Sequence, residues 1–206
     1  GYNLFLLHRA GFDAHGIDIV QNDFFAARKV AGANGYSAKL AGADVSELPF
    51  SESTFSAVTA VETLEHIYAP DRLKAVTEIA RILVPGGSFA LSTPNYSSLV
   101  ETGKRLLVRL PFLKRFFPPM CYPVGEVSRS DYHPYSYHRP VTAGELGGML
   151  EEAGFTVMKT RRIIFVWKNV PDCLFPAARL VESILERLPV LSLLASTLVV
   201  SARKTT

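Results

Sequence analysis

Cysteine is scarce in this sequence of 206 residues, and the features it lacks narrow the classes of protein it can belong to. Cys121 and Cys173 lie far apart and form no CxxC or other metal-ligand spacing, which argues against a disulfide-rich secreted domain. A reduced, cytoplasmic setting is therefore expected. No stretch approaches the roughly 18 uninterrupted apolar residues of a membrane-spanning helix. Internal repeats are absent as well, so a repeat architecture is not expected.

A strong charge of either sign is also missing. The 22 Lys and Arg residues and 19 Asp and Glu residues leave a net charge of +3. Without a basic cluster, this excess is too small to predict binding to nucleic acid. What the sequence does have is an ordinary globular composition, with 48% hydrophobic and 20% charged residues. We therefore expect one domain over residues 1–206, built around a full hydrophobic core.

Helical and extended patterns alternate in the first part of the sequence. Apolar residues at helical spacing predict helices over residues 2–10, 21–35 and 70–83. Apolar and β-branched runs predict strands over residues 12–20, 36–44, 55–62 and 88–94. This alternation is typical of an α/β fold with a Rossmann-like, doubly wound sheet that is mostly parallel and has helices on both faces.

The regular pattern returns near the C-terminal end. Thr142 and Glu145 have the spacing of a capping box, and Gly154 stands where a helix commonly ends. They predict a helix, followed by a strand over residues 156–166 and an amphipathic helix over residues 176–188. A last strand over residues 196–204 is expected to be antiparallel to the others.

Residues 96–140 interrupt the alternation and are interpreted as a substrate-lid insertion. Long insertions in enzymes are usually functional loops, which favours this interpretation. The basic and apolar residues of 104–117 also suit a helix on a membrane surface, although Pro111 interrupts it. A dimer contact is the third interpretation of the same stretch.

Acidic residues follow three of the predicted strands, at the edge of the sheet where such folds bind ligands: Asp18, Asp44 and Glu62. A carboxylate offers two acceptor oxygens to a vicinal diol, so Asp18 could hold the ribose of a nucleoside while Ile19 packs on the base. Asp44, next to Val45, could accept from an exocyclic amine. A strand-end aspartate is also a common turn residue or helix cap, and this alternative stays open.

Five segments, in this order, resemble the class I S-adenosylmethionine-dependent methyltransferases: HGIDI, GADVSELPF, FSAVTAVETLEHI, RILVPGGSFALSTPN and YHRPVTAGELGGMLEEAGF. The likeness is to the broad type 11/12 group that includes the ubiquinone-biosynthesis O-methyltransferases. It covers most of the chain and is weakest over residues 96–130 and 164–195. The resemblance implies S-adenosylmethionine as the cofactor and methyl transfer to a small-molecule substrate.

The resemblance also assigns cofactor-binding residues. The acid matching Asp18 holds the ribose, the acid matching Asp44 reads the adenine amino group, and the position of Val61 lies beside the methionine part. Gly1 matches the last glycine of the family's cofactor loop. In the family a strand and most of that loop precede this glycine, so we expect the chain to begin inside the domain. On this interpretation the first strand is missing, and the chain as it stands binds cofactor weakly.

Three histidines are candidate catalytic residues, because a general base assists methyl transfer to a hydroxyl. His66 follows Glu65 just beyond the third predicted strand and is the preferred base, with a purely structural role as the alternative. His133 and His138 lie in the segment expected to cover the substrate, where they could equally pack the lid. The histidines form no HxH or HxxxH spacing with acids, so no metal site is expected.

The leading prediction is an S-adenosylmethionine-dependent methyltransferase that acts on a small molecule. The resemblance implies that the atom that accepts the methyl group is an oxygen. One alternative is a methyltransferase of a lipid or quinone-like substrate that makes peripheral contact with a membrane. Another is a nicotinamide-dependent oxidoreductase, because Asp18 suits either nucleoside, although no Tyr-x-x-x-Lys pair is found. The third alternative is a binding module that has this fold but no catalytic activity.

Overall fold

The computed structural model describes residues 1–110, 127–134, 136–163, 172–188 and 195–205. The helices and strands in these ranges are α1 (Tyr2–Arg9), β1 (His15–Asp18), α2 (Gln21–Ala33), β2 (Lys39–Gly42), β3 (Phe55–Val61), α3 (Arg72–Ile82), β4 (Leu83–Pro94), α4 (Leu99–Arg109), α5 (Ala143–Glu152), β5 (Phe155–Ile163), α6 (Phe175–Arg187) and β6 (Thr197–Lys204). Short 3-10 turns are η1 (Leu64–His66), η2 (Ala69–Asp71) and η5 (Asp172–Leu174). None of the helices in these ranges is both long and apolar enough to cross a membrane.

The strands form a two-stranded part and a four-stranded part. β1 and β2 pair in parallel, and the other four strands are hydrogen-bonded in the order β3-β4-β6-β5. β3 and β4 are parallel, whereas β6 is antiparallel to both of its neighbours. The predicted Rossmann-like sheet with an antiparallel last strand is therefore confirmed.

The two parts of the sheet meet through side chains within the described residues. β1 and β3 are not paired with each other there. The ring of His15, at the start of β1, instead makes edge contacts with Phe50 and Phe55, with centroid separations of 5.9 and 5.5 Å. Phe55 begins β3, so these contacts join the starts of the two strands.

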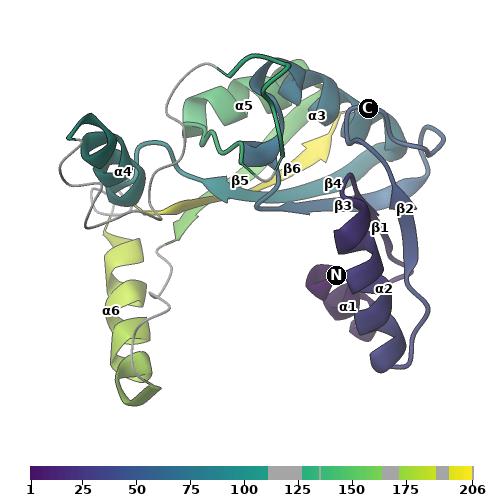
Figure 1. Ribbon diagram of the computed structural model, residues 1–206, viewed down its shortest axis with the longest axis horizontal. Coiled ribbons are helices and arrows are strands. Elements are labelled where there is room, and N and C mark those ends of the chain that lie inside the picture. The colour runs from purple at the N-terminus through teal and green to yellow at the C-terminus, as the bar shows by residue number, and fades with distance from the viewer. Residues whose placement is uncertain (111–126, 135, 164–171, 189–194, 206) are drawn as a thin grey trace.

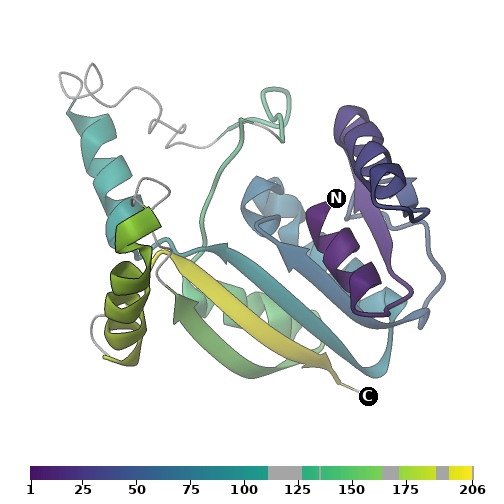
Figure 2. The same cartoon turned by 90° about the horizontal axis from the view of Figure 1, so that it is seen from below.

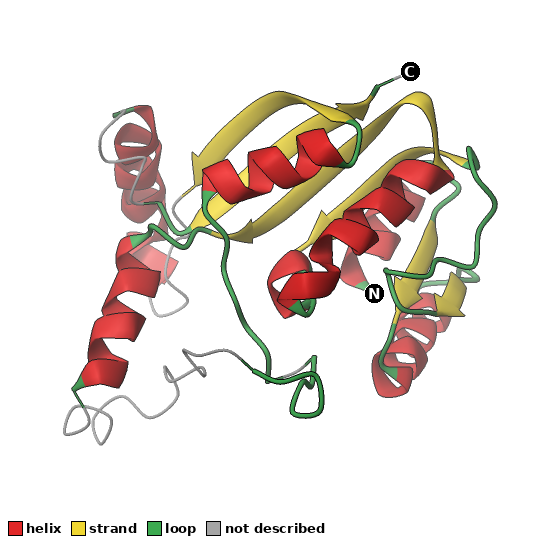
Figure 3. Cartoon of the chain, turned by 90° about the horizontal axis from the view of Figure 1, so that it is seen from above, coloured by secondary structure: helices red, strands yellow, loops and turns green. Residues whose placement is uncertain are grey.

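Helices lie on both sides of the sheet. Figure 1 shows α3 and α5 on one side of the four-stranded part, and α1 and α2 on the other side, beside β1 and β2. Figure 3 shows α3 and α5 lying over the sheet, roughly along the strands, and Figure 2 shows β4, β6 and β5 side by side from below. Both views place α4 and α6 together, at the end of the sheet away from α1 and α2.

The core forms between α3, α5 and the face of the sheet that they cover. Helical spacing in α3 buries Ala75, Val76, Ile79 and Ala80 on one side of the helix. α5 contributes Leu146 and Leu150 to the same cluster. Burial of each large apolar side chain is worth about 1.5–3 kcal/mol, so this contact is what holds α3 and α5 against the strands.

Two elements differ from the sequence prediction. β4 begins at Leu83 rather than at residue 88, because the VPGG segment continues the strand, with Gly86 at a φ of +73°. α4 lies inside the predicted insertion, begins at Leu99, and ends at Arg109, before Pro111. A residue that precedes proline is disfavoured in helical conformation, which explains this end. The remainder of the basic and apolar stretch lies outside the described residues.

The capping box of α5 yields a stability prediction. The Thr142 hydroxyl accepts from the Glu145 N–H at 3.1 Å, and the Glu145 carboxylate accepts from the Thr142 N–H at 2.8 Å. Thr142→Ala removes the first bond and should lower the free energy of unfolding by about 0.5–2 kcal/mol, measured by urea denaturation. Thr77→Ala, within α3, is the control and should leave stability unchanged or slightly raised, because alanine favours helix. Equal effects of the two changes would contradict the capping role.

Candidate active site

Asp18 ends β1 and Asp44 closely follows β2, two strands that lie side by side. Asp18 is opposite Gly42 in the register of β1 and β2, and the Ala43 N–H donates to the Asp18 carbonyl at 3.1 Å. Asp44 therefore follows at the same edge of the sheet. The structure brings the two predicted acids to one place.

Both aspartates are also turn residues, which was the alternative raised from the sequence. Oδ1 of Asp18 accepts from the Val20 N–H, and Oδ1 of Asp44 accepts from the Ser46 N–H, each at 2.8 Å. These bonds hold Oδ1 of each carboxylate and do not involve Oδ2. A turn role and a ligand role are compatible at both positions.

The apolar residues predicted beside these acids differ in exposure. Ile19 and Val61 are 53% and 47% exposed, so both present apolar surface at strand ends. Val45 is half-buried and packs against the core. The first two can therefore contact a ligand without rearrangement of the core.

Gly1 lies where α1 begins and packs directly against α2. A Cβ atom at Gly1 would stand 3.0 Å from both Cα and Cβ of Ala27, closer than side chains normally approach. α1 ends just before β1 and runs back along it, because Leu4 reaches the position of Gly16 in the strand. The start of α1 is therefore at the same end as Asp18.

Glu62 continues β3 in an uncommon backbone conformation. Its φ is +50°, a left-handed value that few residues other than glycine adopt. Its N–H donates to the Ser92 carbonyl at 3.0 Å, and its carboxylate accepts from the Ser92 hydroxyl at 2.8 Å. These bonds to β4 hold Glu62 in this conformation, which is of a kind that clusters at active sites.

Glu65 is a buried carboxylate in the turn η1, with 1% of its surface exposed. Its Oε2 accepts from the Thr93 hydroxyl at 3.0 Å. Burial is the main reason that its pKa is raised, and the neighbouring charge of Glu62 raises it further. Oε1 stands 3.9 Å from Nε2 of His66, a separation too long for a direct hydrogen bond.

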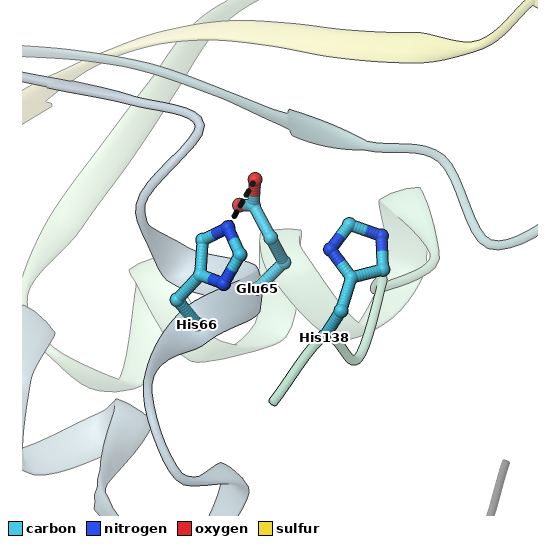
Figure 4. A group of neighbouring side chains, drawn as sticks. All are labelled: Glu65, His66 and His138. Atoms are coloured by element: carbon cyan, nitrogen blue, oxygen red, sulfur yellow. Dashed lines mark ion pairs between the residues drawn. The ribbon is translucent and has the colours of Figure 1, made fainter. Parts of the chain in front are cut away.

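His66 is held in one orientation by two backbone carbonyls. Its Nδ1 lies 2.8 Å from the Tyr137 carbonyl oxygen and 3.1 Å from that of Pro134. A carbonyl can only accept, so Nδ1 carries the proton. In the neutral ring, Nε2 then has a free lone pair, and Figure 4 shows that nitrogen directed toward Glu65.

His138 completes a group with Glu65 and His66, whereas His133 is outside it. One ligand atom from each of the three residues lies within 4.8 Å of the other two, and the two imidazole rings are 5.5 Å apart. Nε2 of His138 is 3.8 Å from Oε1 of Glu101. Of the predicted histidines, the structure therefore brings two together, a proximity that their sequence spacing did not predict.

Glu101 lies behind His138 and is paired with Lys104 at 2.6 Å. Burial, the largest influence, favours the protonated carboxyl, but the neighbouring His138 and the hydrogen bond from Lys104 outweigh it and lower the pKa of Glu101. Glu101 is consequently an anion next to His138. Sequence reasoning missed this residue, which lies inside the predicted insertion.

Arg72 joins the chain segments that carry the two histidines. It is 3% exposed and donates to the backbone carbonyls of Ile67, Glu65 and Arg139. The Arg139 N–H also donates to the Glu65 carbonyl at 2.9 Å. Burial lowers the pKa of Arg72 from its usual value. Arg72 lies inside the helix predicted over residues 70–83, and no sequence signal marked it.

An aromatic cluster covers the turn that carries His66. The Tyr132 hydroxyl donates to the His66 carbonyl at 2.8 Å, and the rings of Tyr132 and Tyr137 are 5.3 Å apart. Burial and the charge of Asp44 raise the pKa of Tyr132, so this segment extends toward the cofactor side. Residues 132–138 of the predicted lid thus lie against the turn that follows β3, and residues 111–126 are outside the described residues.

A surface hollow lies elsewhere, where β1 and β2 begin. It has a volume of about 340 Å³, and its lining includes His8, Asp13 and Lys39. Asp13 and Lys39 are ion-paired across it at 2.6 Å. It contains none of the predicted cofactor or catalytic residues, so it is not the candidate site.

Relatives of the chain are methyltransferases. Residues 1–91 match the family described as "Methyltransferase domain". The chain is 39% identical over 82 residues to cycloartenol-C-24-methyltransferase 1 of Oryza sativa subsp. japonica, a match covering 38% of this chain and 23% of that protein. It is 27% identical over 169 residues to a demethylmenaquinone methyltransferase of Listeria monocytogenes, covering 77% of this chain and 66% of that protein. The matched chain thus spans less than two thirds of either relative.

A solved structure shares the fold over the full length of the chain. It is 1,6-didemethyltoxoflavin-N1-methyltransferase of Burkholderia thailandensis, with a TM-score of 0.58 and 19% sequence identity. The superposition covers 100% of this chain and 67% of that one. Residues 1–91 are therefore similar to the methyltransferase domain family, and the whole chain shares its fold with this solved methyltransferase.

Proposed function

We propose that the protein transfers the methyl group of S-adenosylmethionine to a hydroxyl oxygen of a small, largely apolar molecule. The observation that carries this proposal is the pair of fixed carboxylates, Asp18 and Asp44, at the ends of two adjacent strands. The turn carrying Glu65 and His66 follows a third strand and supplies groups suited to an acceptor.

The cofactor would lie along the ends of β1 and β2. Oδ2 of Asp18 accepts from the ribose hydroxyls, with Ile19 against the adenine, while Asp44 and Val45 receive the adenine edge. Val61 lies beside the methionine part, and Gly1 lets the start of α1 approach it. The solved relative from Burkholderia thailandensis, which contains S-adenosylhomocysteine, supports a cofactor site in this fold.

Methyl transfer from a sulfonium is an in-line displacement. The acceptor oxygen attacks the methyl carbon, the carbon–sulfur bond breaks, and S-adenosylhomocysteine leaves as a neutral thioether. The hydroxyl must also lose its proton, and Nε2 of His66 is the acceptor for it, because Nδ1 is already committed to backbone carbonyls. Glu65 lies 3.9 Å away and would stabilise the imidazolium that forms. His138 and His133 would help to enclose the acceptor from the lid.

The acceptor is proposed to be apolar around its hydroxyl. The named substrates of the relatives, a sterol and demethylmenaquinone, are apolar molecules. Tyr96, Leu99 and Val100 are exposed at the start of α4, next to the end of β4. Such a surface suits an apolar ring or chain adjacent to the reacting group.

Contact with a membrane surface is a second candidate feature, favoured by one observation. α6 exposes an apolar row at helical spacing: Leu180, Val181, Ile184 and Leu188. An amphipathic helix of this kind can bury its apolar face at the lipid boundary. An apolar acceptor dissolved in the bilayer would then be reached from the end of the sheet where α4 and α6 lie.

Cofactor binding is tested by Asp18→Ala. Loss of hydrogen bonds to a charged group costs about 1.5–3 kcal/mol, so the affinity for S-adenosylhomocysteine, measured by calorimetry, should fall roughly 10- to 150-fold. Asp13→Ala, at an aspartate that lies before β1 and is ion-paired with Lys39, is the matched control and should leave the affinity unchanged. Equal affinities of Asp18→Ala and the unaltered chain would refute the ribose assignment. Tighter binding of NAD than of S-adenosylhomocysteine would favour the oxidoreductase alternative.

The base role is tested by His66→Gln with a panel of phenols, catechols and quinols as acceptors. The rate of methyl transfer should fall about 10²–10⁴-fold, because proton transfer contributes that much to such reactions. Affinity for S-adenosylhomocysteine should not change, since His66 is outside the proposed cofactor site. The exposed His8 provides the control, His8→Gln. An unchanged rate of methyl transfer in His66→Gln would exclude this residue as the base.

Membrane contact is tested by sedimentation with phosphatidylglycerol vesicles. The chain should pellet with the vesicles, and the double change Leu180→Glu and Ile184→Glu should release it, because it places two charges on the apolar row. Thr156→Glu adds a charge to the exposed surface of β5 and should pellet like the unaltered chain. Vesicle binding that is unchanged by the two α6 substitutions would exclude this row as the contact surface.

A further inference from the structure

The group formed by Glu65, His66 and His138 has the chemistry of a metal site. It offers one carboxylate oxygen and two imidazole nitrogens, and these ligand atoms lie within 4.8 Å of one another. A dication held at about 2.0–2.2 Å from three such atoms needs them roughly 3–4 Å apart. The pair from Glu65 and His66, at 3.9 Å, already has that spacing, and small side-chain rotations bring the third atom in.

The orientation of His66 is the one that a metal ligand requires. A metal-bound imidazole commonly donates its other ring N–H to a carbonyl or carboxylate, which fixes the ring and directs the lone pair at the ion. Here Nδ1 donates to the carbonyl oxygens of Tyr137 and Pro134, and Nε2 faces the Glu65 carboxylate. Nε2 of His66 and Oε1 of Glu65 are both acceptor atoms, and no hydrogen bond joins them. Such a pair of atoms can bind a cation or share a proton.

The other two side chains are supported in the same way. Oε2 of Glu65 accepts from the buried hydroxyl of Thr93 at 3.0 Å, which leaves Oε1 directed toward His66. Nε2 of His138 lies 3.8 Å from the Glu101 carboxylate, and Figure 4 shows one nitrogen of this ring turned toward Glu65 and His66. Each candidate ligand therefore has a second group that sets its direction.

The group is buried in the protein at Glu65 and exposed to solvent at His66. Glu65 is buried, while the side chain of His66 is 39% exposed. An ion can therefore enter from solvent and keep coordination positions that no protein atom fills. Three protein ligands with an open position are the arrangement of catalytic zinc sites, including those with a two-histidine, one-glutamate set.

We propose that Glu65, His66 and His138 bind one divalent first-row transition metal ion, with Zn²⁺ preferred over Mg²⁺. Two imidazoles select against Mg²⁺ and Ca²⁺, which take oxygen ligands. If the proposed function holds, the open position faces the acceptor hydroxyl. With the ion bound, the ion lowers the pKa of that hydroxyl and its proton leaves to solvent, whereas Nε2 of His66 accepts the proton only in the metal-free chain. Metal binding itself does not depend on methyl transfer and is tested separately.

The test is calorimetry on the full chain, after treatment with EDTA and dialysis, with ZnCl2, MnCl2 and MgCl2 in separate titrations. We expect one equivalent of Zn²⁺ to bind and Mg²⁺ to bind at least about 100-fold more weakly. His138→Gln and Glu65→Gln should each weaken Zn²⁺ binding by more than about 100-fold. Thr93→Val keeps the shape of the side chain but removes the supporting hydroxyl, and it should weaken binding roughly 10- to 100-fold.

Two controls make every outcome decisive. His8→Gln removes an exposed histidine far from the group and should leave Zn²⁺ affinity unchanged. X-ray absorption at the zinc edge of the unaltered chain should report two imidazoles and oxygen, with no sulfur from Cys173. This measurement needs no variant, so it decides the question even if Glu65→Gln fails to fold by circular dichroism.

The proposal is overturned by the absence of Zn²⁺ binding, by unchanged affinity in His138→Gln, or by sulfur in the zinc shell. S-adenosylhomocysteine binding, measured in the same samples, separates this result from the proposed function. A chain that binds S-adenosylhomocysteine but no metal retains the methyltransferase assignment and loses the metal site. A chain that binds metal but not S-adenosylhomocysteine retains the metal site and loses the methyltransferase assignment.

Discussion

The buried guanidinium of Arg72 is the constraint on which the candidate site depends. It donates to three backbone carbonyls, on Glu65, Ile67 and Arg139, and so joins two segments that are far apart in the sequence. A guanidinium presents its donors in a rigid, planar arrangement, which fixes the separation of the groups it binds. His66 and His138 are each adjacent to a carbonyl that Arg72 holds. Arg72 therefore holds the two histidines close together, along with the bond from the Arg139 N–H to the Glu65 carbonyl and those from His66 to backbone carbonyls.

The site has two halves, and different parts of the sheet position them. The β1–β2 pair places Asp18 and Asp44 at one edge, because parallel strands end together. The β3–β4 pair does the same for Glu62 and for the turn that continues to Glu65, with Ser92 and Thr93 of β4 as their partners. Tyr132 connects the two halves. Its hydroxyl donates to the His66 carbonyl, and the charge of Asp44 contributes to raising its pKa.

Local features were predictable from the sequence, and long-range ones were not. The capping box at Thr142 and the acids at the strand ends depend on a few neighbouring residues, whose preferences are strong. The contact of His66 with His138 depends on backbone carbonyls and on Arg72, and no spacing in the sequence encodes it. Glu65 and Thr93 were likewise inconspicuous, because a buried hydrogen bond between two strand ends has no periodic pattern.

The most direct measurement is a crystal structure of the chain with S-adenosylhomocysteine. The account predicts density along the ends of β1 and β2, with both ribose hydroxyls within hydrogen-bond distance of Asp18 and the adenine amino group toward Asp44. The homocysteine sulfur should point toward the turn that carries His66. Density in the hollow beside Asp13 and Lys39, or a ribose that does not contact Asp18, would contradict it.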